Sequence, residues 1–435
     1  MKRLLFLFIA VLSGTLLTVK AQDSIPVDYR LTLEQCLDFA FGNNYQRQVM
    51  KLTENLNEES YKQSKAERLP NLNASLNESF NNSKANSSSW NGNYGLNSGI
   101  TLYKGGAISN TIEQNKLLTE QSVYQTQKYD NDLIIQILQS FLTVLGNEEL
   151  LKYQEAVVKA SEAQLEQGKA QFDAGQILES DYFLLEAQYA TDKNNITDTK
   201  IARDNSLLTL KSLLSMNPLE TLEIVYPSTD ALENMAIIPN KNYVVEEAMN
   251  NLPELKISRY DIDIAEVGIK LSKAGYLPTL SLGASIGTGH NNDFSDFGSQ
   301  LSNGLNEQIG LTLSIPIYDN SRTKAKVAQS KIQLQQAELQ KKQTDLDIMQ
   351  TVIQEYQNVI SSYNKYQTTD VRQNAYLKTY QAYTAQFNAG AITAVDLLQQ
   401  QNNYISALND FIQSKYSFML NRKILDVYMG KEIKM

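Results

Sequence analysis

The chain contains one sequence unit twice, and this duplication constrains its fold more than any other feature. The segment Ala170–Gly175 recurs with one change as Ala385–Gly390, 215 residues later. Upstream, Ser64–Pro70 recurs with two changes as Ser272–Pro278, at an offset of 208. A chain duplicated in this way builds one supersecondary unit twice and usually relates the copies by a pseudo-symmetry axis.

The first residues have the pattern of a secretory signal peptide. Lys2 and Arg3 precede a mostly apolar run, and Ala21 is a small residue before a plausible cleavage site, so we predict a signal peptide over 1–21. The apolar run is shorter than the ~18 residues of a membrane-spanning helix, which disfavours a permanent anchor. No later stretch approaches ~20 apolar residues, so any part of the mature chain in a membrane must consist of strands.

Composition excludes several classes of site. The chain has one cysteine, Cys36, and one histidine, His290, which argues against a zinc site of the usual kind and against Cys–His chemistry. His290 lies in a Gly-, Asn- and Ser-rich stretch, a poor setting for a Ser-His-Asp triad. The net charge of −9 provides no basic footprint for nucleic acid. We expect no metal, no cofactor and no nucleic-acid partner, and we expect Cys36 to be a buried apolar side chain.

Both copies have the same order of predicted elements: a helix, a proline break, two strands and two long helices. Pro70 and Pro278 end the first helix of each copy, because proline lacks an N–H and disfavours helix in the preceding residue. We predict the first of these helices over Leu33–Lys65. The predicted division of the mature chain is repeat 1 over 22–216 with strands about 71–103, a packed connecting segment over 217–243, and repeat 2 over 244–435 with strands about 279–317.

The predicted strands alternate apolar and polar residues. After Pro278, the apolar residues Leu280, Leu282, Ala284 and Ile286 alternate with polar or small ones. This pattern fits a transmembrane barrel strand or a half-buried soluble hairpin, and the strands alone leave both open. The long polar loops at 81–93 and 287–304 favour the barrel. Four strands cannot close a barrel, whose smallest examples have ~8, so a membrane location requires several chains to associate.

The helices after the strands have a coiled-coil pattern. Apolar residues recur every seven positions in the second copy, and their equivalents follow in the first: Ile332, Leu339, Leu346, Ile353 and Ile360; Leu117, Tyr124, Asn131, Leu138 and Leu145. Some ~60 residues without proline would form a rod of roughly 90 Å. Gly175 and Gly390 lie in the turns at 173–176 and 388–391, where glycine allows the left-handed conformation that ends a helix. Such a rod suits a conduit that crosses a periplasm.

These features together resemble the TolC family of outer-membrane efflux proteins. The resemblance rests on the Leu-Pro breaks at Pro70 and Pro278, Ile315–Tyr318 before a long helix, the two glycine turns, and Ile392–Leu398. It implies a mixed α and β membrane protein with a long helical coiled-coil barrel. It also implies a β-barrel completed by trimerisation, with four strands from each chain.

The resemblance further implies a passive exit duct without catalytic residues. A homotrimer would contact outer-membrane lipid and place its helices in the periplasm. Its tips would dock on a periplasmic adaptor connected to an inner-membrane pump. The docking residues implied are Asp173, Ala174, Gly175, Asn388, Ala389 and Gly390.

The resemblance also places a pore constriction near the tips. Asp396 matches an acidic position that would form a ring in a trimer, whereas the second acidic position is Gln399. Asp181 matches the aspartate of the family's closing network, but Phe387 and Ile392 replace its tyrosine and arginine. Closure by hydrogen bonds and closure by an apolar constriction are therefore the two alternatives. The helix dipole alone would also explain an aspartate in each first helical turn.

Two other functions share some of these features. A soluble periplasmic coiled-coil tether would have the same rods, but it would form no trimer and would not fractionate with the outer membrane. A glycosidase needs a carboxylate pair. With 48 acidic residues a pair can always be found, but no aromatic-rich cleft or Gly-rich loop accompanies one.

Overall fold

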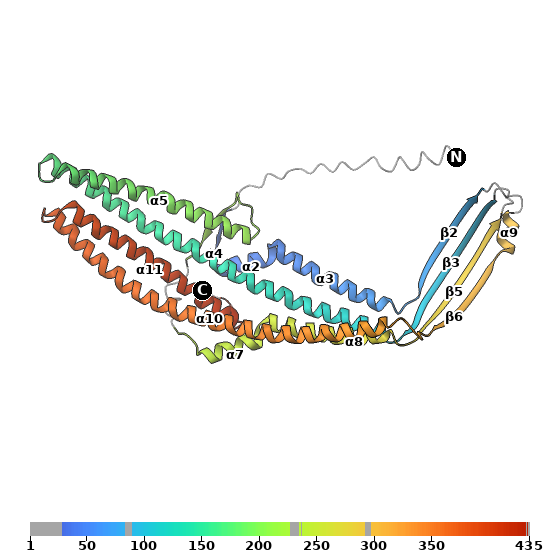
Figure 1. Cartoon of the computed structure of the whole chain (residues 1–435). Coiled ribbons are helices and arrows are strands. Elements are labelled where there is room, and N and C mark those ends of the chain that lie inside the picture. Colours follow the sequence, from blue (N-terminus) through green and yellow to red (C-terminus); the bar gives the residue numbers. More distant parts are fainter. Residues whose placement is uncertain are drawn as a thin grey trace, which may run out of the picture.

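The computed structural model describes residues 28–82, 89–226, 235, 237–291, 297–431 and 433. The predicted signal peptide lies outside these residues. The protein is elongated, with strands at one end and the tips of two helical hairpins at the other (Figure 1). No helix among the described residues combines the length and apolar composition needed to cross a membrane.

The elements of the two copies follow the predicted order. The first copy comprises β1 (Asp28–Leu31), α2 (Leu33–Asn43), α3 (Tyr45–Ala66), β2 (Asn71–Asn81), β3 (Ser89–Lys104), α4 (Ala107–Asp173) and α5 (Glu179–Leu213). The connecting segment contains β4 (Thr221–Ile224). The second copy comprises α7 (Lys241–Asn251), α8 (Pro253–Ala274), β5 (Thr279–Asn291), α9 (Phe297–Asn303), β6 (Asn306–Ser314), α10 (Arg322–Asn388) and α11 (Ala394–Tyr428).

The long strands of both copies form one antiparallel sheet in the order β2-β3-β5-β6. The copies meet at β3 and β5, where Leu96 pairs with Ile286 and Ile100 with Leu282. The sheet therefore has an apolar face, and its large side chains there are solvent-exposed in the protomer: Leu72, Leu76, Phe80, Ile309, Leu311 and Leu313. One segment differs from prediction, because β5 continues to Asn291 and α9 follows within the expected polar loop.

The long helices confirm the predicted rods. The helices α4 and α10 have 67 residues each, which corresponds to about 100 Å at 1.5 Å per residue. The helices α5 and α11 return antiparallel to them over 35 residues. All four helices start and end at residues related by the 215-residue offset. The two copies therefore have the same helix boundaries.

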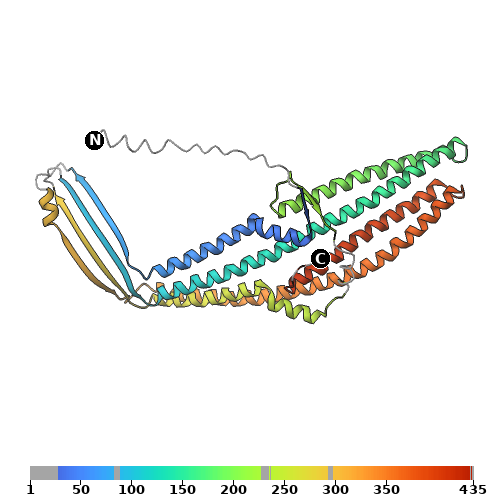
Figure 2. The ribbon, with the colours of Figure 1, turned by 180° about the vertical axis from the view of Figure 1, so that it is seen from behind.

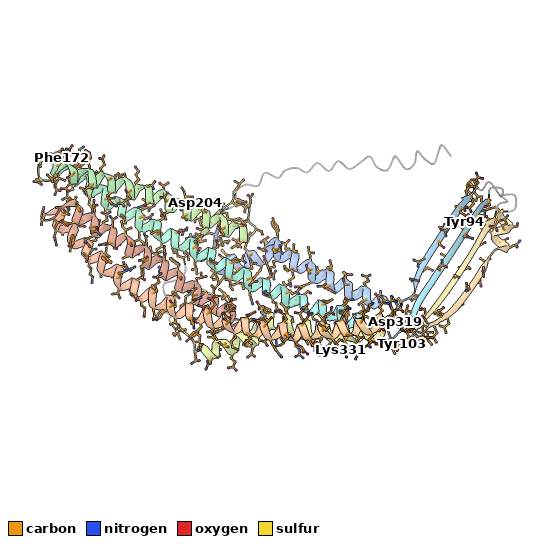
Figure 3. All side chains as sticks on the ribbon, viewed as in Figure 1. Tyr94, Tyr103, Phe172, Asp204, Asp319 and Lys331 are labelled. Carbon is orange, nitrogen blue, oxygen red and sulfur yellow. The ribbon has the colours of Figure 1, made fainter. Side chains whose placement is uncertain are left out.

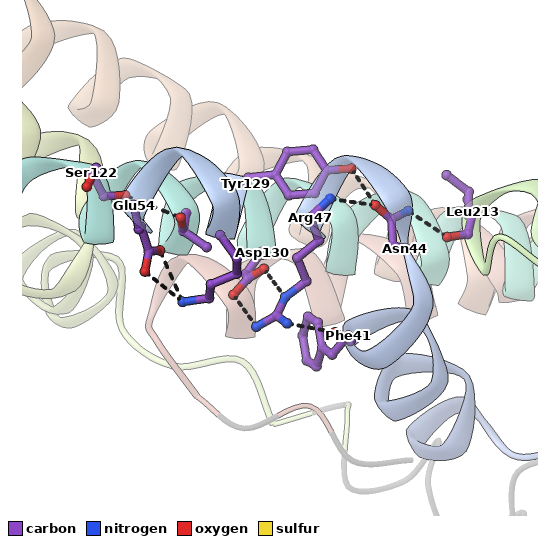
Figure 4. A network of polar contacts seen from close by, with 10 residues as sticks. Phe41, Asn44, Arg47, Glu54, Ser122, Tyr129, Asp130 and Leu213 are labelled. Atoms are coloured by element: carbon purple, nitrogen blue, oxygen red, sulfur yellow. Dashed lines mark hydrogen bonds and ion pairs between the residues drawn. The ribbon is translucent and has the colours of Figure 1, made fainter. Parts of the chain in front are cut away.

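The helix predicted over Leu33–Lys65 is in fact two helices, because the chain breaks at Asn44. The backbone of Asn44 is extended, with ψ 119°, and its side chain accepts a hydrogen bond of 2.9 Å from the N–H of Arg47. Its amide also donates to the carbonyl of Leu213, at the end of α5 (2.8 Å, Figure 4). The break therefore turns α3 away from α2 and sets it end to end with α5, a tertiary contact that local propensity does not encode.

An ion pair between α3 and α4 also stabilises the junction between α2 and α3. The guanidinium of Arg47 contacts Asp130 of α4 at 2.7 Å and donates to the carbonyl of Phe41 at 2.6 Å (Figure 4). The second copy has a weaker counterpart, in which Asn251 donates to Met429 at the end of α11 (3.5 Å). In both copies a short outer helix thus continues the line of a returning helix. Toward the strands, α3 packs against α4, and α8 packs against both α4 and α10 (Figure 2).

The main apolar core lies midway along the rods, where α2, α4, α7, α10 and α11 meet. Its fully buried side chains include Cys36, Leu138, Phe141, Leu145, Val352 and Val359. The parallel pair β1–β4 closes this region, where Leu222 and Ile224 of the connecting segment are buried, whereas Tyr226 is exposed. The cysteine prediction is confirmed: burial raises the pKa of the Cys36 thiol to about 12.

The heptad stripe of the second copy is not buried within one protomer. Ile332, Leu339 and Leu346 are 55%, 65% and 61% exposed. The buried α10 positions toward the strand end are instead small polar residues, Thr323 and Ser330. The stripe therefore faces away from the helices of its own chain.

Candidate functional site at the hairpin tips

Two equivalent turns form the tips of the hairpins. Gly175 and Gly390 adopt left-handed conformations with φ of +69° and +72°. In each turn the residue after the glycine donates its N–H to a carbonyl five residues earlier, from Gln176 to Gln171 (2.8 Å) and from Ala391 to Gln386 (2.9 Å). This pattern satisfies carbonyls at the helix end, and it requires glycine because a Cβ disfavours positive φ.

The predicted docking residues all lie on the surface. Asp173, Ala174, Gly175, Asn388, Ala389 and Gly390 are exposed. A Cβ added at either glycine would have no atom within 4 Å, so only the backbone conformation restricts these positions. Two similar, uncovered turns are thus presented side by side at one end of the molecule (Figure 1).

Asp396 is an exposed helix-capping residue. Thr393 Oγ1 accepts a hydrogen bond from the N–H of Asp396 (3.3 Å), and the Asp396 carboxylate accepts from the N–H of Thr393 (3.3 Å). This reciprocal capping box satisfies donors in the first turn of α11. Asp181 holds the equivalent position in α5, but Leu178 is the N-cap there and provides no side-chain cap. Only the second copy thus has a fully capped tip helix.

The other predicted constriction residues have different surroundings. Gln399 is exposed and donates to Asn403 one turn later (3.4 Å), whereas Ile392 is half-buried. Phe387 differs from expectation, because its ring is only 1% exposed and lies in an apolar cluster. A side chain enclosed in this way is a core residue of the tip and does not face a pore in this conformation.

This apolar cluster joins the two hairpins and was missed by sequence reasoning. It combines Leu185 of α5 with Phe387, Ala394, Leu397 and Leu398 of the second hairpin. The equivalent of Phe387 is Phe172, which lies at the tip and is 36% exposed (Figure 3). Its ring stacks on that of Tyr182, with centroids 5.7 Å apart. The two copies therefore differ at the tip: one ring is buried by the other hairpin, and one is presented outward.

A second candidate surface lies at the opposite end, where the sheet meets the helices. A groove of 980 Å³ is lined mainly by polar and small side chains, including Asn71, Asn97, Thr101, Ser281, Gln308 and Thr312. These residues alternate with the apolar residues of the other sheet face. The described residues contain no group of three or more His, Cys, Asp or Glu side chains that could hold a metal ion. The arrangement is thus a two-faced sheet leading into long polar rods.

Comparison with protein families identifies the chain. The model of the family described as outer membrane efflux protein matches residues 38–215 and 244–431, one match for each copy. The chain belongs to the outer membrane efflux protein family. The two matched ranges leave out the connecting segment 217–243, as a duplicated family unit would.

Individual relatives agree with this family assignment. The outer membrane protein TolC of Escherichia coli is 25% identical over 337 residues, which cover 74% of this chain but only 65% of TolC. The solved structure of CusC has a TM-score of 0.79 at 16% identity, covering 95% of this chain and 96% of CusC. The open-state MtrE outer membrane channel of Neisseria gonorrhoeae has a TM-score of 0.76 at 18% identity, covering 92% and 89%. The resemblance inferred from sequence and the fold class are therefore confirmed.

Proposed function

We propose that this chain is the outer-membrane channel of a tripartite efflux or secretion system and lets small molecules pass without chemical change. The observation that carries the proposal is the sheet, which has one apolar and one polar face and continues into rods of about 100 Å. An apolar outer face fits lipid and a polar inner face fits water. Transport of this kind requires no catalytic residue.

Association of three chains would complete this channel. Strands β2 and β6 form the two edges of the sheet, and open edges are not tolerated in lipid. Three copies would supply twelve strands, an even number within the range of closed outer-membrane barrels. The exposed stripe of Ile332, Leu339 and Leu346 on α10 offers apolar surface that neighbouring protomers could bury. We propose that the rods lie in the periplasm and the sheet in the outer membrane.

Membrane fractionation with gel analysis tests this proposal. We expect the full-length protein in the outer-membrane fraction, migrating as a trimer in SDS unless heated, and conducting ions in planar bilayers. A monomer found only in the periplasmic fraction would contradict the proposal and would favour the soluble tether instead.

We further propose that the tips bind a periplasmic adaptor connected to an inner-membrane pump. Support comes from the exposure of both glycine turns and from their equivalence, which would present six similar tips in a trimer. The substitution Gly390→Pro should abolish co-purification of the adaptor, because proline cannot adopt the positive φ of the turn. Gly298→Pro, in the strand-end helix α9, is the matched control and should leave co-purification unchanged. Equal adaptor recovery with both variants would contradict this docking site.

Asp396 is proposed to line the constriction in addition to capping α11. Three exposed carboxylates brought together by a trimer would attract cations. The variant Asp396→Asn should lower cation selectivity and block by divalent ions in single-channel recordings. Asp173→Asn, a change at an exposed tip aspartate, serves as the control. Unchanged selectivity in the Asp396 variant would show that its carboxylate only caps the helix.

A further inference from the structure

A groove between α4 and α11 lies about midway along the rods. It has a volume of about 290 Å³, and none of the described residues that line it carries a charge. Leu142 and Ile412 are buried at its floor, whereas the amides of Gln139 and Gln413 are exposed at its rim. A concave site with an apolar floor and a few polar groups is typical of small-molecule binding.

Gly146 opens this groove onto an aromatic ring. A Cβ at Gly146 would lie only 3.4 Å from Cδ2 of Tyr416, so a larger side chain here would cover the ring. The hydroxyl of Tyr416 donates to the carboxylate of Glu149 (2.6 Å), which also accepts from Lys415 (2.7 Å). These two charges pair with each other and do not line the groove. The groove therefore offers a flat apolar surface without a charge, which suits another ring.

Asn409 supplies a polar group that has no partner. Its side chain lines the groove, and its Oδ1 is buried without accepting a hydrogen bond from the described part of the chain. A buried acceptor that lacks a donor costs free energy. The Asn409 amide therefore gains a hydrogen bond when it turns toward an N–H or O–H that a ligand brings into the groove.

The groove opens away from the short elements of the fold. Phe141 of α4 lies in the main core with residues of α2 and α7. Thr143, which lines the groove, follows it by two residues and so lies about 200° around the same helix. A duct of closed helices stays open only if the short elements lie outside it. In such a ring the groove faces the lumen.

The other copy does not repeat the uncharged lining. At the 215-residue offset, Leu150 corresponds to Lys365 on α10 and Gln413 corresponds to Asp198 on α5. Both charged residues are exposed in the protomer, as positions that meet only between chains would be. By the same offset, the joint between neighbouring protomers would bring these opposite charges together. A trimer would therefore hold three uncharged grooves, one in each protomer.

We propose that this groove binds uncharged amphipathic small molecules that carry a flat ring and an N–H or O–H donor as they pass along the duct. The ring would pack on Tyr416, and the donor would reach Asn409. This inference rests on the proposed function, because the groove faces the lumen only in a closed ring of chains. Binding must be weak, since a solute in transit has to leave again.

Three compounds with one ring system and different charges test the proposal. N-acetyltryptophanamide is neutral, N-acetyltryptophan is an anion and tryptophanamide is a cation. For a neutral compound of about 18 non-hydrogen atoms we expect a dissociation constant on the order of 0.1 mM. Both charged compounds should bind at least tenfold more weakly, because the groove offers no opposite charge. Binding to trimers in nanodiscs is measured by saturation-transfer NMR, with empty nanodiscs as the blank.

Variants locate the binding in the groove. Gly146→Leu fills it and should weaken binding of the neutral compound at least tenfold. Asn409→Leu removes the acceptor and should weaken it about tenfold. Asn402→Leu, at an exposed asparagine two turns earlier on α11, is the matched control and should bind normally. Gln413→Lys, at the exposed rim, should make the anion bind more tightly than the neutral compound.

Single-channel recordings on the same samples separate the two proposals. Conducting trimers that bind all three compounds equally would overturn the inference and leave the channel intact. Unchanged binding in Gly146→Leu would do the same. If Gly146→Leu does not assemble, Gln413→Lys decides, and an unchanged order of affinities in that variant would overturn the groove as the site. Absence of conducting trimers in the unmodified protein would overturn the proposed function and this inference with it.

Discussion

The turn between β3 and α4 provides a stringent test of how the two copies fit together. Gly105 and Gly106 both have positive φ, +60° and +81°. A Cβ at Gly105 would lie 2.6 Å from the carbonyl oxygen of Ala274 and 2.7 Å from the Cβ of Leu277, at the end of α8 in the other copy. At Gly106 the nearest atom would be 3.7 Å away. We therefore predict that Gly105→Ala destabilises the protein much more than Gly106→Ala.

The expected magnitudes follow from these distances. Either alanine adopts a left-handed conformation, which costs roughly 1–2 kcal/mol for an L-residue. Only Gly105→Ala also collides with a backbone oxygen, which no side-chain rotation can relieve, and such overpacking costs about 1–3 kcal/mol more. The equivalent positions in the second copy are Asn320 and Ser321, with φ of 55° and 61°. The turn conformation therefore tolerates side chains in the second copy, and the end of α8 is what excludes one at Gly105.

The measurement is guanidinium unfolding of the detergent-solubilised protein. Trp90 is the only tryptophan and lies in β3, the strand that leads into this turn, so its fluorescence reports on the relevant sheet. The free energy lost by Gly105→Ala should exceed that lost by Gly106→Ala by about 1–3 kcal/mol. Ser321→Gly should be neutral or stabilising, since glycine adopts a positive φ without the steric cost of a Cβ. Equal losses for the two alanine variants would refute the steric argument.

Three further predictions concern buried groups. Phe387→Ala should destabilise the tip by about 3–5 kcal/mol and speed local hydrogen exchange, whereas Phe172→Ala, at its exposed equivalent, should have a much smaller effect. The thiol of Cys36 should resist maleimide in the native protein and react only after unfolding, because burial raises its pKa to about 12. The raised pKa of Asp192 means that the folded chain retains a proton which the unfolded chain releases. Stability should therefore fall as pH rises between these two pKa values, and Asp192→Asn should remove this slope in unfolding midpoints measured against pH.

The tip illustrates how far sequence reasoning reaches. The glycine turns at Gly175 and Gly390 were predicted from a local motif, because the left-handed residue and its hydrogen bonds lie within a few positions of one another. The burial of Phe387 could not be predicted in this way. Phe172 and Phe387 lie in almost identical sequences, but Leu185 and Leu165 of the other hairpin pack in the cluster that buries Phe387. A periodic pattern identifies an apolar face but not the neighbour that covers it.

The duplication is visible from comparison of the two copies in the sequence. The element order, the proline breaks, the glycine turns and the lengths of the rods were also determined by the sequence alone, since each depends on residues close together along the chain. The tertiary structure decided the break at Asn44, the outward direction of the Ile332–Leu346 stripe, and the hydrogen bonds between the hairpins from Gln401 to Asp192 and from Tyr416 to Glu149. These features depend on contacts between segments up to 267 residues apart, as for Glu149 and Tyr416. Two copies of one sequence unit share their local conformation, but within one chain each copy meets different neighbours.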